Sequence, residues 1–365
     1  MKLMVLFGTR PEIIRLSLII KRLDLFCEQI LVHTGQNYDE TLSDIFFSEM
    51  GVRSPNLHLG VRATSYGEQI GQIIAAASRA LDEVRPDRVL ILGDTNSGLA
   101  AIVAARRGIP VFHLEAGNRC YDDRVGEEIN RRVIDHVSSV LLPYTHRSKE
   151  NLLREGIERD RIFVVGNPIQ EVLSEFEPQI RASDTLDRLR VSPSRFFLAT
   201  IHRAENVDHT ERLTKLLEGF SVIADTYEMP VIISTHPRTA DQIQRKGLAV
   251  SSERVRLVRP MGFFDFVNLE RNAYCVLTDS GTVQEECCIM GIPNVTVRDV
   301  TERAETIECG SSVLSGADPS LMLGSVRLVV ESAPEWRVPC EYLEKRVSRT
   351  VTNVLLGFTA LRKRG

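Results

Sequence analysis

The segment KLMVLFGTRPEIIRLSLIIKRLDLFCEQILVHT, residues 2–34, shows the pattern on which the whole chain is built. Its apolar runs KLMVLF and QILVHT are short and rich in Val, Ile and Leu, which is typical of strands buried on both faces. Residues 11–25 between them have the length and amphipathic character of a helix. A strand, a helix and a further strand in this order predict a parallel sheet covered by helices.

The same alternation continues and later restarts. Further strand-like runs are DRVLILGD, GIPVFHLEAG, SVLLP, RFFLATIH, MPVIISTH, VRLVRP, YCVLTDSG and IPNVTVR. Residues 65–84 and 126–139 have helical length. At 365 residues, two such series predict an α/β protein with two doubly wound, Rossmann-like domains that face a cleft.

The domain boundary is expected near Gly166-Asn167-Pro168, after the strand-like run RIFVVG. This division gives a first domain of residues 1–168 and a second domain of residues 169–349. A polar helical stretch at 170–189 would lead into the second domain. The tail has helical periodicity, so a C-terminal helix at about 350–365 is expected to return to the first domain.

The composition excludes several classes of protein. Lys and Arg number 45 against 49 Asp and Glu, whereas nucleic-acid binders usually carry a strong basic excess, so no nucleic-acid partner is expected. No run approaches the ~18 apolar residues of a membrane span, and the apolar residues 3–7 are too few for a secretion signal. The seven cysteines include no Cys-x-x-Cys pair, so we expect free thiols in the cytoplasm and no metal.

Polar residues at the expected strand ends are the first candidates for a site, because open α/β sheets bind ligands beyond the carboxyl ends of their strands. Arg10 precedes Pro11 at the start of a helix, a place that favours anions. Asp94 and Glu115 each follow a strand, and Glu127 lies at the start of a helix. Carboxylates crowded into one cleft push each other's pKa values apart, which creates acid and base roles.

Each of these residues also has an ordinary structural explanation. Arg10 can be a surface arginine in a tight turn, and Asp94 can cap a helix. Glu127 and its neighbour Glu128 can interact with the helix dipole and pair with Arg131 and Arg132.

In the second half of the chain, His202 and His236 follow two strands, and the turn Ser280-Gly281-Thr282 follows a third. The backbone N–H groups of this turn begin a helix and can cradle a diphosphate. A carboxylate about one turn into that helix can bind both hydroxyls of a ribose. The alternatives are a core histidine at 236 and a capping box of Thr282 with Glu285.

Two further features concern cofactors. No Gly-x-Gly-x-x-Gly loop occurs at a strand–helix junction, so no nicotinamide cofactor is expected. The pair Cys287-Cys288 follows a helix start, where adjacent side chains point in different directions, and we interpret both residues as inert core thiols.

An ordered set of motifs resembles a known family. These motifs are GTRPE at 8–12, TGQ at 34–36, GDT at 93–95, HLEAGNR at 113–119, GEEINRR at 126–132, HRAEN at 202–206, TDSGTVQEE at 278–286 and TERAE at 301–305. Over nearly its whole length the chain resembles the non-hydrolysing UDP-N-acetylglucosamine 2-epimerases. The resemblance implies the GT-B fold of nucleotide-sugar glycosyltransferases, with UDP bound between the domains and neither NAD nor a metal as cofactor. It also implies a homodimer.

The resemblance further implies a chemistry for the UDP-sugar. The C2 proton is removed, UDP leaves from C1 to give 2-acetamidoglucal, and UDP then adds back with protonation of the other face. By motif, the catalytic carboxylates are Asp94, Glu115 and Glu127, and His202 is a further catalytic or leaving-group residue. The UDP ligands implied in the same way are Arg10, His236, Ser280, Gly281 and Glu286, with Glu286 on the ribose.

The chain departs from the family pattern at several positions. Arg15 stands where the family commonly has Lys, Gly126 where it has Pro, and Thr282 where it has Gly, while TERPE has become TERAE. Arg15 lies one turn into the first helix, so we expect it to bring positive charge to the diphosphate or to the departing UDP. The alternative is a solvated surface arginine.

Other substrates and other reactions are alternatives to the epimerisation of UDP-N-acetylglucosamine. The EAGNRCYD and DSGT forms also resemble a branch that epimerises UDP-2-acetamido-2,6-dideoxy-L-talose to UDP-N-acetyl-L-fucosamine. A hydrolysing epimerase has a different opening motif, and the three carboxylates of the first domain argue against a glycosyltransferase. A non-catalytic UDP-sugar-binding protein is the alternative from another class.

Overall fold

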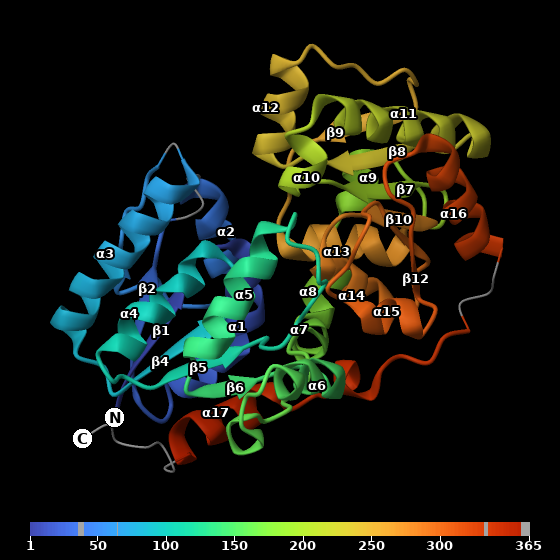
Figure 1. Cartoon of the computed structure of the whole chain (residues 1–365). Helices are drawn as coiled ribbons and strands as arrows, with labels where there is room; N and C mark the ends of the chain where they lie inside the picture. Colours follow the sequence, from blue (N-terminus) through green and yellow to red (C-terminus); the bar gives the residue numbers. More distant parts are fainter. Residues whose placement is uncertain (36–39, 64, 332–334, 359–365) are drawn as a thin grey trace. The chain divides into compact units, whose positions relative to one another are not determined.

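The computed structural model describes residues 1–35, 40–63, 65–331 and 335–358, without the side chains of residues 40–44. Gln36 of the TGQ motif and residues 359–365 of the expected C-terminal helix lie outside this part. The chain forms two units, each described by itself: Met1–Ser174 with Cys340–Gly365, and Glu175–Pro339 (Figure 1).

The first unit contains a six-stranded parallel sheet in the order β3-β2-β1-β4-β5-β6. Its strands are β1 (Lys2–Phe7), β2 (Glu28–His33), β3 (Leu57–His58), β4 (Arg88–Leu92), β5 (Val111–Leu114) and β6 (Val140–Leu142). The direction in which strands are added reverses between β1 and β4, and α/β sheets bind ligands at such a switch point. The side chains from Leu3 to Phe7 are buried, as expected of a strand covered on both faces.

The helices of the first unit agree with the periodicity of the sequence. They are α1 (Arg10–Leu23), α2 (Glu40–Met50), α3 (Tyr66–Val84), α4 (Ala101–Arg106), α5 (Gly126–Val137), α6 (His146–Arg154), α7 (Ile169–Glu175) and α17 (Val347–Gly357). Pro11 lies in the first turn of α1, where its missing N–H leaves no hydrogen bond unmade. The side chain of Ser65 caps α3 by accepting a hydrogen bond from the Glu68 N–H at 3.3 Å.

The second unit repeats the same topology with the strand order β12-β11-β10-β7-β8-β9. Its strands are β7 (Phe197–Thr200), β8 (Val231–Ser234), β9 (Val255–Val258), β10 (Cys275–Thr278), β11 (Asn294–Thr296) and β12 (Ser312–Leu314). Its helices are α8 (Glu177–Arg181), α9 (Thr185–Leu189), α10 (Ala204–Val207), α11 (Thr210–Tyr227), α12 (Pro237–Arg245), α13 (Phe263–Asn272), α14 (Gly281–Met290), α15 (Ala304–Glu308) and α16 (Pro319–Glu331). Two doubly wound parallel sheets confirm the predicted α/β fold class.

Some local predictions were wrong. The run RIFVVG is not a strand of the sheet, because it pairs with β6 only through an isolated bridge between Leu141 and Ile162. The stretch 170–189 is helical as predicted, although it is divided into the three short helices α7, α8 and α9. The short strands β3 and β12 were missed, since two or three residues carry no readable period.

The tail rejoins the first unit at Cys340, about ten residues before the expected helix. Backbone contacts explain this early return: the Asn167 N–H donates to the Glu341 carbonyl at 2.9 Å. The Ser348 N–H donates to the Glu171 carboxylate at 2.8 Å, which places α7 in this unit as well. Within the described ranges, no helix is both long enough and apolar enough to cross a membrane.

Candidate active site

Glu115 lies directly after β5, at the carboxyl end of the first unit's sheet, and its side chain is buried. Its backbone is left-handed with φ of 71°, a conformation that costs a non-glycine residue roughly 1–2 kcal/mol. Its Oε2 forms an ion pair with Arg15 and accepts a hydrogen bond from the Tyr144 hydroxyl at 3.1 Å. Its Oε1 accepts a hydrogen bond from Asn118 Nδ2 at 3.3 Å. These contacts fix the carboxylate in one orientation at a strained residue, as is common in active sites.

Arg15 extends from α1 into the interior and is only 3% exposed. Its guanidinium carbon lies 5.8 Å from the centre of the Tyr144 ring, so the positive charge of Arg15 is stabilised by both the aromatic face and the Glu115 carboxylate. The alternative interpretation as a solvated surface arginine is therefore wrong.

Glu12, which the site prediction missed, joins two loops at the end of the sheet. Its Oε2 accepts hydrogen bonds from the Gly8 N–H at 3.0 Å and from the N–H and hydroxyl of Thr9, both at 2.7 Å. Its Oε1 accepts one from the Thr95 hydroxyl at 3.2 Å. Burial raises the pKa of Glu12 to about 7, although these donors lower it. Arg10 begins the same helix, α1, and is half-buried, with its guanidinium carbon 5.6 Å from the Phe46 ring centre.

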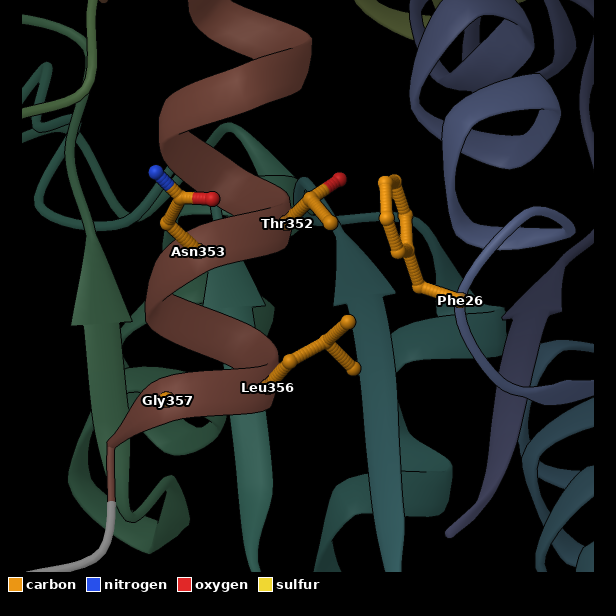
Figure 2. A pocket seen from close by; sticks show the side chains of 5 residues that line it. All are labelled: Phe26, Thr352, Asn353, Leu356 and Gly357. Atoms are coloured by element: carbon orange, nitrogen blue, oxygen red, sulfur yellow. The ribbon is translucent and has the colours of Figure 1, made fainter.

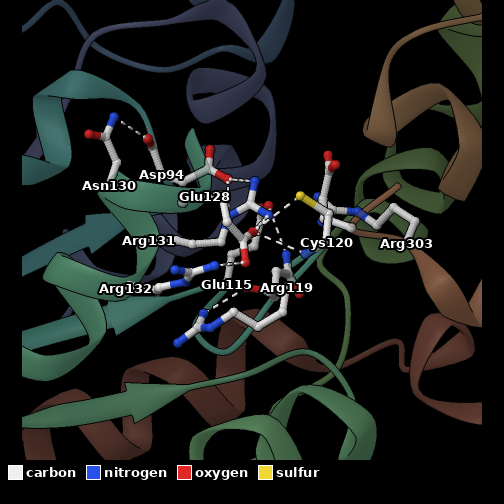
Figure 3. A network of polar contacts seen from close by, with 12 residues as sticks. Asp94, Glu115, Arg119, Cys120, Glu128, Asn130, Arg131, Arg132 and Arg303 are labelled. Atoms are coloured by element: carbon white, nitrogen blue, oxygen red, sulfur yellow. Dashed lines mark hydrogen bonds and ion pairs between the residues drawn. The ribbon is translucent and has the colours of Figure 1, made fainter. Parts of the chain in front are cut away.

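Asp94 follows β4, the strand next to β5, and forms an ion pair with α5 (Figure 3). Arg131 donates to Oδ2 of Asp94 from Nε at 3.0 Å and from Nη2 at 2.6 Å. The side chain of Asn130 donates to the Asp94 carbonyl at 3.0 Å. Asp94 therefore lies in an ion pair instead of acting only as a helix cap, and 21% of its side chain is exposed.

The two adjacent glutamates at the start of α5 have different environments. Glu128 is fully buried, and its carboxylate accepts hydrogen bonds from the N–H groups of Cys120 at 3.0 Å and Tyr121 at 3.1 Å. It also forms an ion pair with Arg131 at 2.8 Å, so Arg131 connects Glu128 with Asp94 in the network drawn in Figure 3. Glu127 is half-buried, and its charge adds to burial in raising the pKa of Tyr66. Of the two, Glu127 is the glutamate that solvent or a ligand can reach.

Beneath Asp94 and Glu115 lies a buried layer that the site prediction also missed. His113 on β5 contacts Oδ1 of Asp135 from Nδ1 and the Gly93 carbonyl from Nε2, both at 2.8 Å. Oδ2 of Asp135 accepts hydrogen bonds from the Gly117 N–H at 3.1 Å and from Arg119 at 2.8 Å. The backbone at Gly117, two residues after Glu115, is thus held by Asp135 directly, and the backbone at Gly93, next to Asp94, is held through His113.

In the second unit, the buried carboxylate of Asp279 positions His202. Asp279 accepts hydrogen bonds from the N–H groups of His202 and Arg203, each at 3.0 Å, and from Asn206 Nδ2 at 3.0 Å. Nδ1 of His202 lies 3.1 Å from Oδ1 of the same carboxylate. Burial alone would raise the pKa of Asp279, but the histidine and the N–H donors outweigh it and lower this pKa. The anionic aspartate holds an imidazole that is 38% exposed.

The turn that follows β10 begins α14 at Gly281. A side chain at 281 would come within 2.8 Å of Oε1 of Glu302, so only glycine fits there without a shift. The Ser280 N–H donates to the Thr278 hydroxyl at 2.9 Å. Since Thr278 on β10 pairs with Thr200 on β7, this turn and His202 follow neighbouring strands.

Two other predicted ligands of the second unit also have defined surroundings. His236 caps α12 by accepting a hydrogen bond from the Arg238 N–H at 3.2 Å, and its ring centre lies 6.3 Å from that of His202. It is half-buried at a helix end, so the alternative of a core histidine is wrong. Glu286 on α14 is 3% exposed and interacts with Glu270 of α13, whose pKa is raised by burial and by the neighbouring Glu286 charge.

A cavity of about 420 Å³ lies elsewhere on the first unit (Figure 2). It is lined by Phe26, Thr352, Asn353, Leu356 and Gly357, none of which is a titratable side chain. It therefore offers no acid or base for proton transfer. Among the residues that the structure describes, no three His, Cys, Asp or Glu side chains are grouped to hold a metal ion.

Comparisons with known proteins agree on one family. Its sequence model, described as UDP-N-acetylglucosamine 2-epimerase, matches residues 22–356. The UDP-N-acetylglucosamine 2-epimerase of Methanocaldococcus jannaschii is 40% identical over 350 residues, 93% of this chain and 95% of that protein. The UDP-2,3-diacetamido-2,3-dideoxy-D-glucuronate 2-epimerase of Pseudomonas aeruginosa is 37% identical over 332 residues, 90% of this chain and 92% of that protein. The crystal structure of M. jannaschii UDP-GlcNAc 2-epimerase with UDP-GlcNAc and UDP matches with a TM-score of 0.93 at 37% identity, over 98% of this chain and 99% of that one.

Proposed function

The chain belongs to the UDP-N-acetylglucosamine 2-epimerase family, and we propose that it interconverts UDP-N-acetylglucosamine and UDP-N-acetylmannosamine by eliminating UDP and adding it back. The protein is an isomerase. The observation that carries the mechanism is the pair of carboxylates on neighbouring strands, Asp94 after β4 and Glu115 after β5, each held by an arginine. Such fixed carboxylates are suited to remove a proton and to return one.

The first unit provides the proton-transfer groups of this proposal. Asp94, Glu115 and Glu127 remove the C2 proton from one face of the sugar and deliver a proton to the other face. The leaving oxygen of UDP gains negative charge as the C1–O bond breaks, and a preorganised cation stabilises that charge. Arg15 is the candidate for this cation, because its ion pair and its burial hold the guanidinium in place.

The second unit provides the groups that bind UDP. The turn at Ser280 and Gly281 leads into the ten-residue helix α14, and the N–H groups at the N-terminus of that helix attract the diphosphate. Glu286 binds the ribose hydroxyls, and His236 is a further UDP ligand. Arg10, at the start of α1 in the first unit, is proposed as a UDP ligand as well. His202, oriented by Asp279, is the candidate for a proton donor to the departing UDP oxygen.

We favour UDP-N-acetylglucosamine as the substrate over its 6-deoxy relative. The M. jannaschii relative at 40% identity carries that name, and none of the relatives described above is named for UDP-2-acetamido-2,6-dideoxy-L-talose. A cytoplasmic homodimer completes the proposal: all seven cysteines are free thiols, which suits a reducing compartment. Light scattering after size exclusion tests the dimer.

Turnover in D2O tests the function. The full chain is incubated with UDP-N-acetylglucosamine in D2O without added NAD or metal, and proton NMR follows the sugar signals. The proposal predicts a C2 epimer that carries deuterium at C2, because solvent supplies the returning proton. An Asp94→Asn variant serves as the control for uncatalysed exchange. A product without deuterium at C2 would indicate another mechanism, such as transient oxidation, and the absence of any C2 epimer would reject the function.

A further inference from the structure

Two cysteines of the second unit lie sulfur to sulfur although the proposed reaction uses neither. Sγ of Cys288 on α14 is 3.8 Å from Sγ of Cys309, which caps the end of α15. Cys288 is buried, whereas Cys309 is partly exposed. The exposed member of the pair can therefore meet a small oxidant from solvent, and its buried neighbour is already within contact distance.

We propose that Cys288 and Cys309 form a reversible disulfide when the protein meets a hydroperoxide, with Cys309 as the thiol that reacts first. This proposal replaces the interpretation of Cys288 as an inert core thiol, and it leaves that interpretation in place for the neighbouring Cys287, which points in a different direction on α14.

The surroundings favour Cys309 as the nucleophile. The hydrogen bond that it shares with Cys288 lowers the pKa of the Cys309 thiol below its usual range, although partial burial opposes the shift. The nearby Ser311 hydroxyl acts in the same direction. For Cys340, the exposed cysteine, the Glu341 carboxylate raises the thiol pKa. Since the thiolate is the reactive form, exposure alone does not make Cys340 the better target.

The chemistry balances with hydrogen peroxide as the oxidant. The Cys309 thiolate attacks one peroxide oxygen, an S–O bond forms as the O–O bond breaks, and the released hydroxide takes up a proton to become water. The resulting sulfenic acid is then attacked by the sulfur of Cys288. The S–S bond forms, the S–O bond breaks, and the leaving hydroxide takes the Cys288 proton as a second water. Two electrons pass from the two sulfurs to the peroxide.

Closing the bond must bring Cys288 on α14 and Cys309 at the end of α15 closer together. A disulfide needs a sulfur separation of about 2.05 Å, well below the 3.8 Å observed here. Glu285, one turn before Cys288, is tied to Arg303 by an ion pair of 2.5 Å. Because Gly281 and Glu286 belong to the same helix, oxidation is expected to weaken UDP binding, and this expected loss of affinity rests on the proposed function.

The single tryptophan of the chain reports on the site. Nε1 of Trp336 donates a hydrogen bond to the Cys288 carbonyl at 3.0 Å, and the sequence contains no other Trp. Movement of Cys288 changes this contact, so the intrinsic fluorescence of the intact protein follows the oxidation directly.

The experiment treats the reduced full chain with hydrogen peroxide, blocks the remaining thiols and maps the peptides without reduction. We expect a cross-link between Cys288 and Cys309, the loss of two thiols per chain, and a change in Trp336 fluorescence that dithiothreitol reverses. Cys340→Ser should behave like the wild type. Cys288→Ser should stop at a sulfenic acid on Cys309 that dimedone traps, and Cys309→Ser should show neither cross-link nor fluorescence change. No cross-link, or dimedone labelling at Cys340 instead of Cys309, would overturn the proposal.

Titration with UDP separates this inference from the proposed function. Oxidised wild-type protein should bind UDP at least several-fold more weakly than reduced protein, whereas peroxide-treated Cys309→Ser should keep its affinity. If the cross-link forms and UDP affinity is unchanged, the coupling between disulfide and site is wrong. If reduced protein does not bind UDP at all, the proposed function fails while the disulfide stands.

Discussion

Arg15 and Glu115 form an ion pair in the interior of the first unit, with side chains only 4% and 5% exposed. They are a hundred residues apart in sequence and come from α1 and the end of β5. Removing one partner from a buried pair leaves an uncompensated charge and costs roughly 3–5 kcal/mol. The residue at position 15 therefore affects both the stability of the unit and the electrostatics of the proposed site, and experiments on it must separate the two.

Neutral, nearly isosteric substitutions of the proposed proton-transfer groups should reduce turnover, and Glu115→Gln should also lower stability because it leaves the buried Arg15 without its carboxylate partner. Asp94→Asn, Glu115→Gln and Glu127→Gln are each expected to lower kcat by at least ~10², the usual scale for general acid–base groups. The measurement is the rate of C2 epimer formation by NMR, together with a circular dichroism melt. Near-normal turnover of Glu127→Gln would show that this residue serves only the helix dipole.

The neighbouring glutamate provides a matched control. The fully buried Glu128 carboxylate accepts hydrogen bonds from two backbone N–H groups and pairs with the Arg131 guanidinium. Glu128→Gln should therefore mainly lower the stability of the protein. We expect a loss of about 1–3 kcal/mol in the free energy of unfolding, because an amide NH2 group faces these donors. Thermal melting measures this. The assignment of roles within the pair would be reversed if Glu128→Gln melted normally and lost turnover while Glu127→Gln kept it.

The sequence predicted the sheets and the polar residues at strand ends better than it predicted the buried side chains that hold those residues in place. Runs such as KLMVLF are recognisable as strands because they are short and rich in Val, Ile and Leu, and Asp94 and Glu115 follow from where such runs end. The buried network of His113, Asp135 and Arg119 was missed, because residues from β5, α5 and the loop between them meet only in the fold. The position of Glu12 could have been predicted from the sequence, because Thr9-x-x-Glu12 is a capping-box pattern.

Glu12 predicts a defined dependence of stability on pH. Its pKa is about 7 in the folded protein, against 4.5 for an unperturbed glutamate, so the folded state binds the proton more tightly than the unfolded chain. A raised pKa stabilises the fold below pH 4.5, and this contribution is lost as the pH rises through 7. The loss amounts to about 3 kcal/mol from this one buried group.

The Glu12→Gln variant isolates this effect. The amide mimics the neutral acid, and its NH2 group can donate to the Thr95 hydroxyl while its oxygen keeps the donors of Gly8 and Thr9. Urea unfolding between pH 5 and 8 should show a smaller fall in stability with pH for this variant than for the wild type. Parallel curves for the two proteins would mean that Glu12 is already ionised in the fold at pH 5.

Arg15 itself allows the sharpest test of the proposed electrostatics. Arg15→Lys keeps the positive charge and loses only the planar arrangement of the guanidinium donors, so this variant should retain measurable activity. Arg15→Met keeps much of the apolar stem without charge, and kcat/KM for UDP-N-acetylglucosamine should fall by a further ~10² or more because no cation meets the departing UDP oxygen.

Arg15→Met also leaves the buried Glu115 carboxylate without a positively charged partner, so a double variant, Arg15→Met with Glu115→Gln, controls for folding. The double variant should recover melting temperature, because neither charge of the pair is left alone; it also lacks the Glu115 carboxylate, so it reports on stability and not on activity. Equal kcat/KM in the Lys and Met forms would contradict the electrostatic role of Arg15 and leave it only a structural partner of Glu115.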